Sequence, residues 1–236
     1  MFIMIDGIDG SGKSTVIQAW KDFLTKEGNA IFDLKNYWKE KNKYPQVSEI
    51  KSYDFVFSCE PTRVGIGQVI RDELIRGGNN YPASAIADAY SLDRLILYTK
   101  TLIPLLKKRR CIIQDRGISS TLAYQTIKDG VPFEDVAGLT GNKLALKYRP
   151  DHLVILSTDP ETACKRLKIR SEKKDNAIFE KLEFMKKIAT QFRSKRYQEI
   201  FNKCGTQIHY LSGEEKIDIM KEQAIGLLKN ILNIKK

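Results

Sequence analysis

Residues 7–15 match G-x-x-x-x-G-K-[ST], a phosphate-binding pattern. A short apolar run precedes it and a stretch of helical periodicity follows it, which is the context that the pattern needs. Glycines let the backbone turn tightly around a phosphate, whose oxygens accept hydrogen bonds from successive amides at a helix start. We expect Lys13 to reach the β- and γ-phosphates of a nucleoside triphosphate, and the Ser14 hydroxyl to bind Mg²⁺. The predicted triphosphate site consists of Gly7, Gly10, Ser11, Gly12, Lys13, Ser14 and Thr15.

A second motif, Asp115-Arg116, follows a later apolar run, residues 111–114. The carboxylate of Asp115 suits Mg²⁺, partly through water. The guanidinium of Arg116 suits an anionic second substrate, because its planar fork binds phosphate oxygens in pairs. The pair therefore favours a kinase whose acceptor already carries a phosphate.

The same motifs argue against two other nucleotide-binding classes. A guanine-specific GTPase needs an Asn-Lys-x-Asp string, and the nearest candidate, residues 142–145, reads Asn-Lys-Leu-Ala. A motor or helicase ATPase typically carries Asp-Glu after its second core strand, where the glutamate activates water. Here an arginine takes the place of that glutamate.

Composition sets the broad class of the protein. The chain has 236 residues, 42% of them hydrophobic and 29% charged, which excludes a disordered, collagenous or disulfide-built protein. Its four cysteines are far apart in sequence, which is typical of reduced thiols. The apolar start, residues 1–5, is too short for a signal or membrane segment, and we expect a cytoplasmic protein. The 40 Lys and Arg against 29 Asp and Glu give a net charge of +11, which favours anionic partners.

Short apolar runs alternate with longer segments of helical period, which predicts βαβ units and a parallel sheet. One α/β domain, a P-loop kinase fold in three layers, should then span 1–236, with five strands flanked by helices. The predicted strands are 2–5, 30–34 or 55–58, 111–114, 152–157 and 207–211. The predicted helices are 13–26, 66–75, 84–106, 160–169, 179–201 and 214–232. Residues 35–53 begin with a basic, aromatic stretch without clear period, and we interpret them as a long loop or insertion, most simply a solvated flap.

The motifs occur in an order that resembles the thymidylate kinase family of nucleoside monophosphate kinases. The motifs that carry the resemblance are 7–15, Glu60-Pro61-Thr62, Gly67 with Ile70-Arg71, Asp93-Arg94, Asp115-Arg116 with Ser119, Ser120 and Ala123-Tyr124-Gln125, Arg149-Pro150-Asp151 and the segment 179–184. The resemblance implies a five-stranded parallel sheet, a mobile lid at about 168–178 and a homodimer. It also implies transfer of the γ-phosphate of ATP, with Mg²⁺, to dTMP, giving dTDP and ADP.

The resemblance also implies roles on the acceptor side. Asp9 would contact the sugar 3′-hydroxyl, and Arg116 would hold the acceptor phosphate, which makes both catalytic together with Lys13. Arg94 would bond to the thymine edge and Tyr90 would stack on the base. Tyr124 would lie against the sugar and disfavour a 2′-hydroxyl. The implied dTMP site comprises Asp9, Arg71, Tyr90, Arg94, Arg116, Ser120, Tyr124 and Gln125.

On the donor side, Arg166 would pack on the adenine of ATP, and Arg170 would belong to the lid. Several positions depart from the family pattern. Cys59 occupies the place of an arginine, so one phosphate contact is missing or supplied by Arg63 or Arg71. Gly117 replaces an aromatic residue or histidine, and Ile178 replaces a lid arginine.

Three alternatives to a dTMP kinase stay open. A deoxynucleoside kinase shares the fold but phosphorylates a neutral hydroxyl, and the Asp115-Arg116 pair argues against it. A related kinase with a different base preference also stays open, because the departures from the family pattern leave the kinase chemistry intact. A basic nucleic-acid-binding ATPase would use residues 35–53 and the run 107–110, but that run directly precedes a strand and is typical of a solvated turn. Nucleic acid is therefore disfavoured as a partner, and membrane is not expected.

Overall fold

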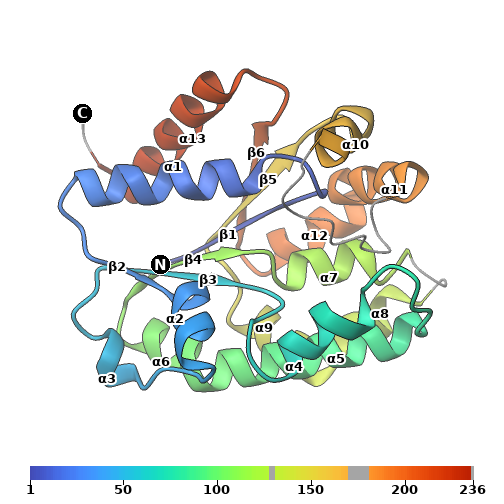
Figure 1. Cartoon of the computed structure of the whole chain (residues 1–236), viewed down its shortest axis with the longest axis horizontal. Coiled ribbons are helices and arrows are strands. Elements are labelled where there is room, and N and C mark those ends of the chain that lie inside the picture. Colours follow the sequence, from blue (N-terminus) through green and yellow to red (C-terminus); the bar gives the residue numbers. More distant parts are fainter. Residues whose placement is uncertain (128–130, 170–180, 235–236) are drawn as a thin grey trace.

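A parallel sheet of six strands forms the centre of the molecule (Figure 1). The computed structural model describes residues 1–127, 131–169 and 181–234. The strand order is β2-β3-β4-β1-β5-β6, which places the first strand between two later ones. The strands are β1 (Phe2–Gly7), β2 (Ile31–Asp33), β3 (Phe55–Cys59), β4 (Cys111–Asp115), β5 (His152–Ser157) and β6 (Gln207–Ser212).

The prediction of a parallel α/β sheet is confirmed, and the strand count is six in place of five. The sequence offered 30–34 and 55–58 as alternatives, and the structure pairs both, as β2 and β3. Strand β2 has only three residues and lies at the edge of the sheet, so its apolar signal is weak. Every residue of β1 and of β3 is buried, which explains why these two strands read as continuous apolar runs.

Helices cover both faces of the sheet and create two hydrophobic cores. Helices α1 (Lys13–Lys26) and α13 (Ile217–Leu232) pack together on one face, where the Trp20 indole donates to the Ala224 carbonyl at 2.7 Å. The other face is covered by α5 (Ala83–Leu97), α6 (Ile103–Lys107), α7 (Ile118–Tyr124), α11 (Leu182–Arg193) and α12 (Lys195–Lys203). A π-helical turn, η2 (Tyr98–Leu102), joins α5 to α6, so the predicted helix 84–106 is confirmed as one rod.

The expectation of a long loop at 35–53 is wrong, whereas the alternative of an insertion there stays a prediction. The segment contains α2 (Leu34–Lys41) and α3 (Val47–Ile50), and the Asp33 carboxylate caps α2 by accepting from the Lys35 and Asn36 amides. Leu34, Trp38 and Ile50 are fully buried against the sheet. Burial of each such side chain contributes about 1.5–3 kcal/mol, and this holds the segment on the domain. Its apolar residues are too few and its helices too short for a periodic signal.

The remaining helices follow the sequence less closely. The predicted helix at 66–75 is α4 (Ile66–Val69) continued by a π-helical turn, η1 (Ile70–Leu74), and the one at 160–169 is α10 (Pro160–Ile169). The predicted helix at 179–201 divides at Ser194, whose hydroxyl accepts from the Tyr197 amide and starts α12. Helices α7, α8 (Phe133–Gly138) and α9 (Thr140–Lys147) were not predicted. They are short, and α7 is buried on nearly all sides, so it lacks an amphipathic pattern.

The parallel register brings the carboxyl ends of β1, β3 and β4 to one edge. Ile5 of β1 lies beside Asp115 of β4, and Cys59 of β3 lies on the other side of Asp115. Open α/β sheets bind ligands outside the carboxyl ends of their strands, at the point where the connections that follow two neighbouring strands lead in opposite directions. Within the described residues, no helix is long and apolar enough to cross a membrane.

Candidate active site

The phosphate-binding loop joins the central strand β1 to α1. Gly7, Gly10 and Gly12 have φ angles of 143°, 77° and 102°, in the region that favours glycine. A Cβ on Gly10 would lie 2.4 Å from the Ala163 carbonyl oxygen, so α10 packs directly on the loop. The loop is therefore fixed by the sheet on one side and by α10 on the other, as a site for a phosphate requires.

Lys13, the first residue of α1, reaches back over this loop. Its ammonium donates to the carbonyls of Gly7 at 2.9 Å and Ile8 at 2.8 Å. Burial and repulsion by Arg116 lower the pKa of Lys13 to about 8, although Asp9 and Asp115 oppose the shift. Lys13 is therefore mostly charged at neutral pH and lies where the phosphates of a nucleotide would meet the loop.

Arg116 lies between the loop and the opposite wall of the site. Its guanidinium donates to Asp9 at 2.6 Å, to Asp6 and the Gly7 carbonyl at 3.1 Å, and to the Ser120 hydroxyl at 2.9 Å. The neighbouring carboxylates keep the pKa of Arg116 well above its usual value, against the effect of burial. The side chain is thus permanently charged and fixed in direction by four groups.

Asp6 is a site residue that the sequence analysis did not predict. Its carboxylate is fully buried and accepts hydrogen bonds from the Gly7 amide, the Ser119 and Ser120 hydroxyls and Arg116. A buried carboxylate is costly unless it is paired in this way. The available signal was an acid that ends an otherwise apolar strand directly before the glycine loop.

A cleft of about 720 Å³ opens beside the loop, a size typical of small-molecule sites. The loop and the start of α1 form one wall, and residues of the β3–α4 connection, η1, α5 and α7 form the other. The predicted residues that line it are Asp9, Gly10, Gly12, Lys13, Ser14, Thr15, Arg71, Tyr90, Asp115, Arg116, Ser120, Tyr124, Gln125 and Arg166. The structure therefore brings most of the predicted donor and acceptor residues together. Arg170 and most of the predicted lid lie outside the described residues.

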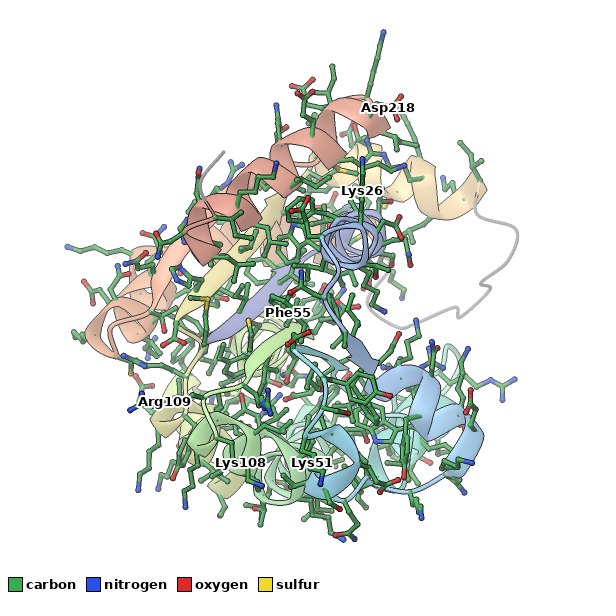
Figure 2. The ribbon with its side chains drawn as sticks, turned by 90° about the vertical axis from the view of Figure 1, so that its left-hand side faces the viewer. Lys26, Lys51, Phe55, Lys108, Arg109 and Asp218 are labelled. Carbon is green, nitrogen blue, oxygen red and sulfur yellow. The ribbon has the colours of Figure 1, made fainter. Side chains whose placement is uncertain are left out.

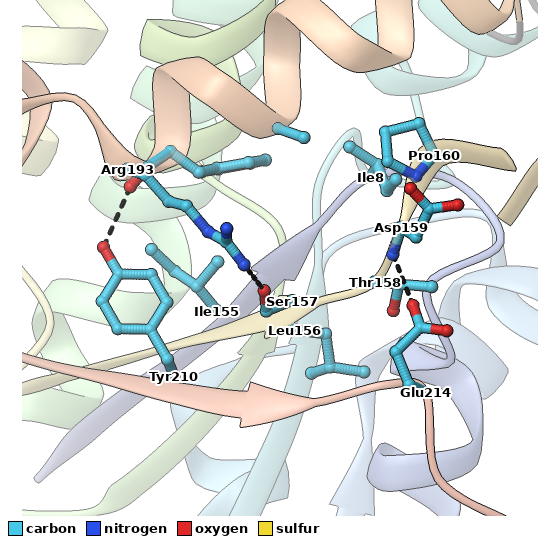
Figure 3. Close-up of a pocket in the computed structure, with 12 residues that line it drawn as sticks. Ile8, Ile155, Leu156, Ser157, Thr158, Asp159, Pro160, Arg193, Tyr210 and Glu214 are labelled. Carbon is cyan, nitrogen blue, oxygen red and sulfur yellow. Dashed lines mark hydrogen bonds between the residues drawn. The ribbon is translucent and has the colours of Figure 1, made fainter. Parts of the chain in front are cut away.

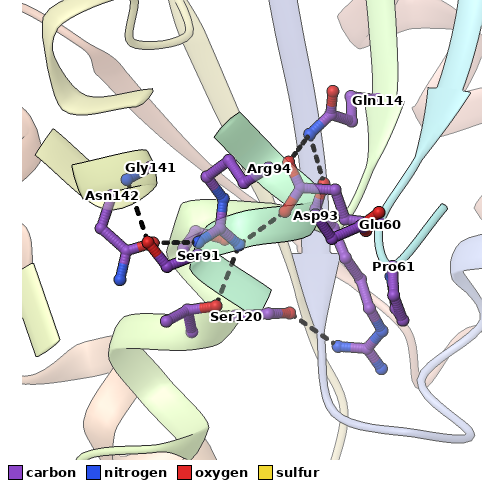
Figure 4. Close-up of polar contacts among 12 residues, drawn as sticks. Glu60, Pro61, Ser91, Asp93, Arg94, Gln114, Ser120, Gly141 and Asn142 are labelled. Carbon is purple, nitrogen blue, oxygen red and sulfur yellow. Dashed lines mark hydrogen bonds and ion pairs between the residues drawn. The ribbon is translucent and has the colours of Figure 1, made fainter. Parts of the chain in front are cut away.

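Arg94 does not line this cleft, in contrast to the expected contact with a base. It is fully buried, and its guanidinium donates to Glu60 at 2.5 Å, to the Thr121 hydroxyl at 2.9 Å and to the Asn142 side chain (Figure 4). Burial raises the pKa of Glu60, and the charge of Arg94 opposes that shift. Because Glu60 and Thr121 do line the cleft, Arg94 fixes the wall from behind.

Gln114 connects this buried pair to Arg116. Its amide nitrogen donates to Glu60 and to the Arg116 carbonyl, both at 2.9 Å (Figure 4). A Cβ at Gly117 would lie 2.5 Å from Met4 Cε and 2.9 Å from Gln114 Nε2. The Met4 and Gln114 side chains therefore occupy the space into which a larger residue at position 117 would extend.

Two arginines line the wall of the cleft opposite the phosphate loop, near Cys59. Arg71 donates to the Thr62 carbonyl at 3.1 Å and to the Pro61 carbonyl, so backbone oxygens hold it at the cleft. Arg63 also lines the cleft, and its buried Nε has no hydrogen-bond partner among the described residues. Cys59 itself is buried and does not line the cleft. Arg63 and Arg71 are thus two cations of the cleft whose charges act on Cys59, the position at which the resemblance implies an arginine.

Asp115 and Ser14 provide the oxygen ligands that Mg²⁺ prefers. Both line the cleft, and Asp115 Oδ1 is buried without a hydrogen-bond partner among the described residues. An unpaired buried carboxylate oxygen next to a phosphate loop is where a hard cation would be bound. The donor set therefore fits Mg²⁺.

The donor side of the cleft rests on the turn between β6 and α13. Arg166 on α10 donates to the Gly213 carbonyl in that turn at 2.7 Å. Behind the loop, the Thr158 hydroxyl donates to the Ser11 carbonyl at 3.0 Å. A smaller pocket of about 310 Å³ lies at this corner, where Arg193 bonds to Ser157 and Glu214 accepts from the Asp159 amide (Figure 3). The Thr158 bond supports the loop directly, and the smaller pocket has one cation, Arg193, among its described lining residues.

A parallel sheet with a glycine-rich phosphate loop on its central strand and an arginine-bearing cleft beside it defines a P-loop phosphotransferase. The family model described as thymidylate kinase matches residues 45–224. The chain therefore belongs to the thymidylate kinase family.

Similar proteins cover nearly the whole chain. A thymidylate kinase from Clostridium novyi is 26% identical over 231 residues, covering 97% of this chain and 98% of the relative. A probable thymidylate kinase from Methanocaldococcus jannaschii is 30% identical over 231 residues, with 98% and 97% covered. The solved structure of thymidylate kinase from Ehrlichia chaffeensis shares the fold with a TM-score of 0.64 and 20% identity, covering 97% of this chain and 98% of that one.

Proposed function

We propose that the protein transfers the γ-phosphate of ATP to dTMP and produces dTDP and ADP. The observation that carries the acceptor assignment is the position of Arg116, a permanently charged fork held by Asp6 and Asp9 between the phosphate loop and the acceptor wall. A guanidinium fixed in this way matches the oxygens of a monophosphate. A neutral hydroxyl acceptor carries no negative charge for this guanidinium to bind.

Catalysis of phosphoryl transfer depends mainly on positioning and on neutralisation of charge. Lys13 and the amides at the start of α1 would bind the donor phosphates, and Arg116 would align the acceptor phosphate with them. The acceptor oxygen is already an anion, so no general base is needed. Mg²⁺, held through Ser14 and Asp115, would neutralise the phosphates of ATP and help to orient them.

The acceptor wall offers features suited to a deoxynucleotide. Tyr124 lines the cleft, and the Arg116 guanidinium carbon lies 5.3 Å from its ring centre. Burial raises the pKa of Tyr90 to about 12, so its ring is neutral and available to stack on a base. Gln125 Oε1 is buried and has no hydrogen-bond partner among the described residues, so it can accept from a base N–H. We assign these three residues to the nucleoside part of dTMP.

A homodimer in the cytoplasm is part of the proposal. It is supported by the family resemblance and by Val69 and Leu92, apolar side chains that are 49% and 46% exposed on the adjoining helices α4 and α5. Light scattering on the purified chain tests the dimer. The variant Leu92→Glu, which introduces a charge at this apolar position, should then shift the mass to that of one chain.

An assay of ADP release across several acceptors tests the reaction. We expect turnover with dTMP to exceed that with dUMP, UMP, CMP and AMP, and thymidine to be inactive. If another monophosphate were the preferred acceptor, the proposed phosphoryl transfer would stand, but the assignment of thymine as the base would be wrong. Turnover with thymidine but not with dTMP would overturn the acceptor site, because a neutral hydroxyl does not require Arg116.

A further inference from the structure

Most of the net charge of the chain lies outside the active site. Residues 35–53 and 98–110 contain ten lysines and arginines and two glutamates, so they account for +8 of the formal +11. The run 107–110 alone is Lys-Lys-Arg-Arg. Substrate binding uses other residues, so this concentration needs a separate explanation.

The fold joins these two segments into one surface, which we call the basic face. Arg110 donates to the Lys51 carbonyl, and the Lys100 ammonium lies 5.8 Å from the centre of the Tyr44 ring. Figure 2 shows Lys51, Lys108 and Arg109 on the same part of the molecule. The basic face consists of Lys39, Lys41, Lys43, Lys51, Lys100, Lys107, Lys108, Arg109 and Arg110.

The basic face lies away from the nucleotide cleft. Arg110 directly precedes β4, and Lys51 lies shortly before β3, so both are near the amino ends of their strands. The phosphate loop and Arg116 follow the carboxyl ends of β1 and β4. None of the nine residues of the basic face lines the cleft, so a nucleotide bound there does not contact them.

The protein itself provides little neutralisation. Apart from Arg110, all members are exposed, and within the described residues no ion pair involves them. The nearby Glu49 carboxylate accepts from the Gln46 amide at 2.7 Å and the Tyr37 hydroxyl at 2.8 Å, and it keeps its charge, so it offsets part of the charge of Lys41 and Lys43 without forming an ion pair among the described residues. Fields of this kind attract polyanions and speed their association.

We propose that the basic face binds the phosphate backbone of a nucleic-acid duplex without reading its sequence. A single strand would need exposed rings for stacking, but Tyr44 packs against Trp38, and Tyr53 against Phe32. A bilayer would need an apolar face, and none of the large hydrophobic residues found exposed lies in these segments. What remains is a group of lysines and arginines, which suits phosphate contacts. The run 107–110 is then part of a binding surface, where the sequence alone indicated a solvated turn.

The test measures binding of the full chain to a labelled DNA duplex of about 20 base pairs by fluorescence anisotropy, over a series of salt concentrations. The variant Lys107→Glu/Lys108→Glu should weaken binding at about 100 mM salt by roughly tenfold or more, and should reduce the slope of log K against log salt by about two. The matched control is Lys187→Glu/Lys221→Glu, which makes the same charge change at exposed positions on α11 and α13. It should change binding less than threefold.

Three results would overturn the proposal. One is an equal loss in both variants, which would mean a response to net charge alone. Another is no measurable duplex binding by the wild type at about 100 mM salt. The last is tighter binding to a single strand, or to vesicles containing phosphatidylserine, than to the duplex. Turnover of dTMP by Lys107→Glu/Lys108→Glu should equal that of the wild type, so this result is independent of the proposed reaction.

Discussion

Arg116 shows how several neighbours can prepare one side chain for a task. Its backbone has φ of 63°, a left-handed conformation uncommon for a residue with a side chain, and its guanidinium has carboxylates on two sides. Such conformations cost energy, and they tend to occur at functional sites. Removal of Arg116 should therefore impair the acceptor site, and it should also destabilise the fold, because it leaves the buried Asp6 carboxylate without its cation.

The variant Arg116→Ala should lower kcat/KM for dTMP by about 30- to 1000-fold, the effect of losing a desolvated charged contact of roughly 2–4 kcal/mol. Arg116→Lys, which keeps the charge but not the fork, should recover only part of that loss. Steady-state kinetics with each substrate varied in turn provide the measurement. The KM for ATP serves as the internal control and should change little. Near-normal turnover of dTMP by Arg116→Ala would remove Arg116 from the acceptor site.

Lys13 leads to a prediction about pH. Its pKa of about 8 means that the free enzyme loses this charge as pH rises through 8. We expect kcat/KM for ATP to fall above about pH 8, since a neutral amine no longer attracts the phosphates. The folding contribution has the opposite sign: the pKa is lowered in the folded state, so the unfolded chain binds more protons and stability rises between about pH 8 and the usual lysine pKa.

A profile of kcat/KM for ATP from about pH 6 to pH 10 measures this effect. Lys13→Arg provides the control, because an arginine stays charged over the whole range. Its activity should be lower, but the fall that begins near pH 8 should be absent. A wild-type profile that stays level to about pH 10 would contradict the assigned pKa.

At the scale of elements, glycine positions report how closely helices pack. Gly141 lies in the first turn of α9, and a Cβ there would be 1.8 Å from the Ser91 carbonyl oxygen of α5. Gly141→Ala should destabilise the protein by about 1–3 kcal/mol, the range for overpacking, although alanine favours a helix. Gly226→Ala in α13 is the control: nothing lies within 4 Å of its Cβ, so it should stabilise by about 0.5–1 kcal/mol. Urea denaturation measures the free energy of unfolding of both variants. A Gly141→Ala protein as stable as the wild type would contradict the close packing of α5 against α9.

The same scale explains what the sequence could predict. The phosphate loop could be predicted from the sequence because all its functional residues lie in one run of nine, residues 7–15. Strands β1, β4 and β5 could be predicted because the central strands of a parallel sheet are buried on both faces and are therefore mostly apolar. The hydrogen bond between Ser119 and Asp6 joins residues 113 positions apart, and the one between Arg94 and Asn142 joins residues 48 positions apart. A local sequence pattern cannot predict contacts of this range. Helix α2 was not predicted, because the burial of Trp38 in the tertiary structure stabilises it and its sequence has no clear helical periodicity.

At the scale of the whole molecule, the proposed reaction requires two ligands on the two sides of one cleft, at the carboxyl edge of the sheet. The donor side rests on β1, α10 and the turn after β6, and the acceptor side rests on the segments that follow β3 and β4. Since both sides share β1 and β4, which pair directly, we expect one cooperative unfolding transition and not two.

Each ligand that binds only the folded state should raise the midpoint of that transition. At about one hundred times its Kd, a ligand contributes roughly 2.7 kcal/mol, which shifts the Tm of a domain of this size by about 5–10 °C. A non-hydrolysable ATP analogue with Mg²⁺ and dTMP should each produce such a shift in scanning calorimetry. In Arg116→Ala the shift from dTMP should disappear while that from the ATP analogue persists, because Arg116 faces the acceptor. Loss of both shifts in Arg116→Ala would mean that Arg116 supports the whole cleft. A second unfolding transition whose midpoint neither ligand raises would mean that one side of the cleft unfolds independently of the other.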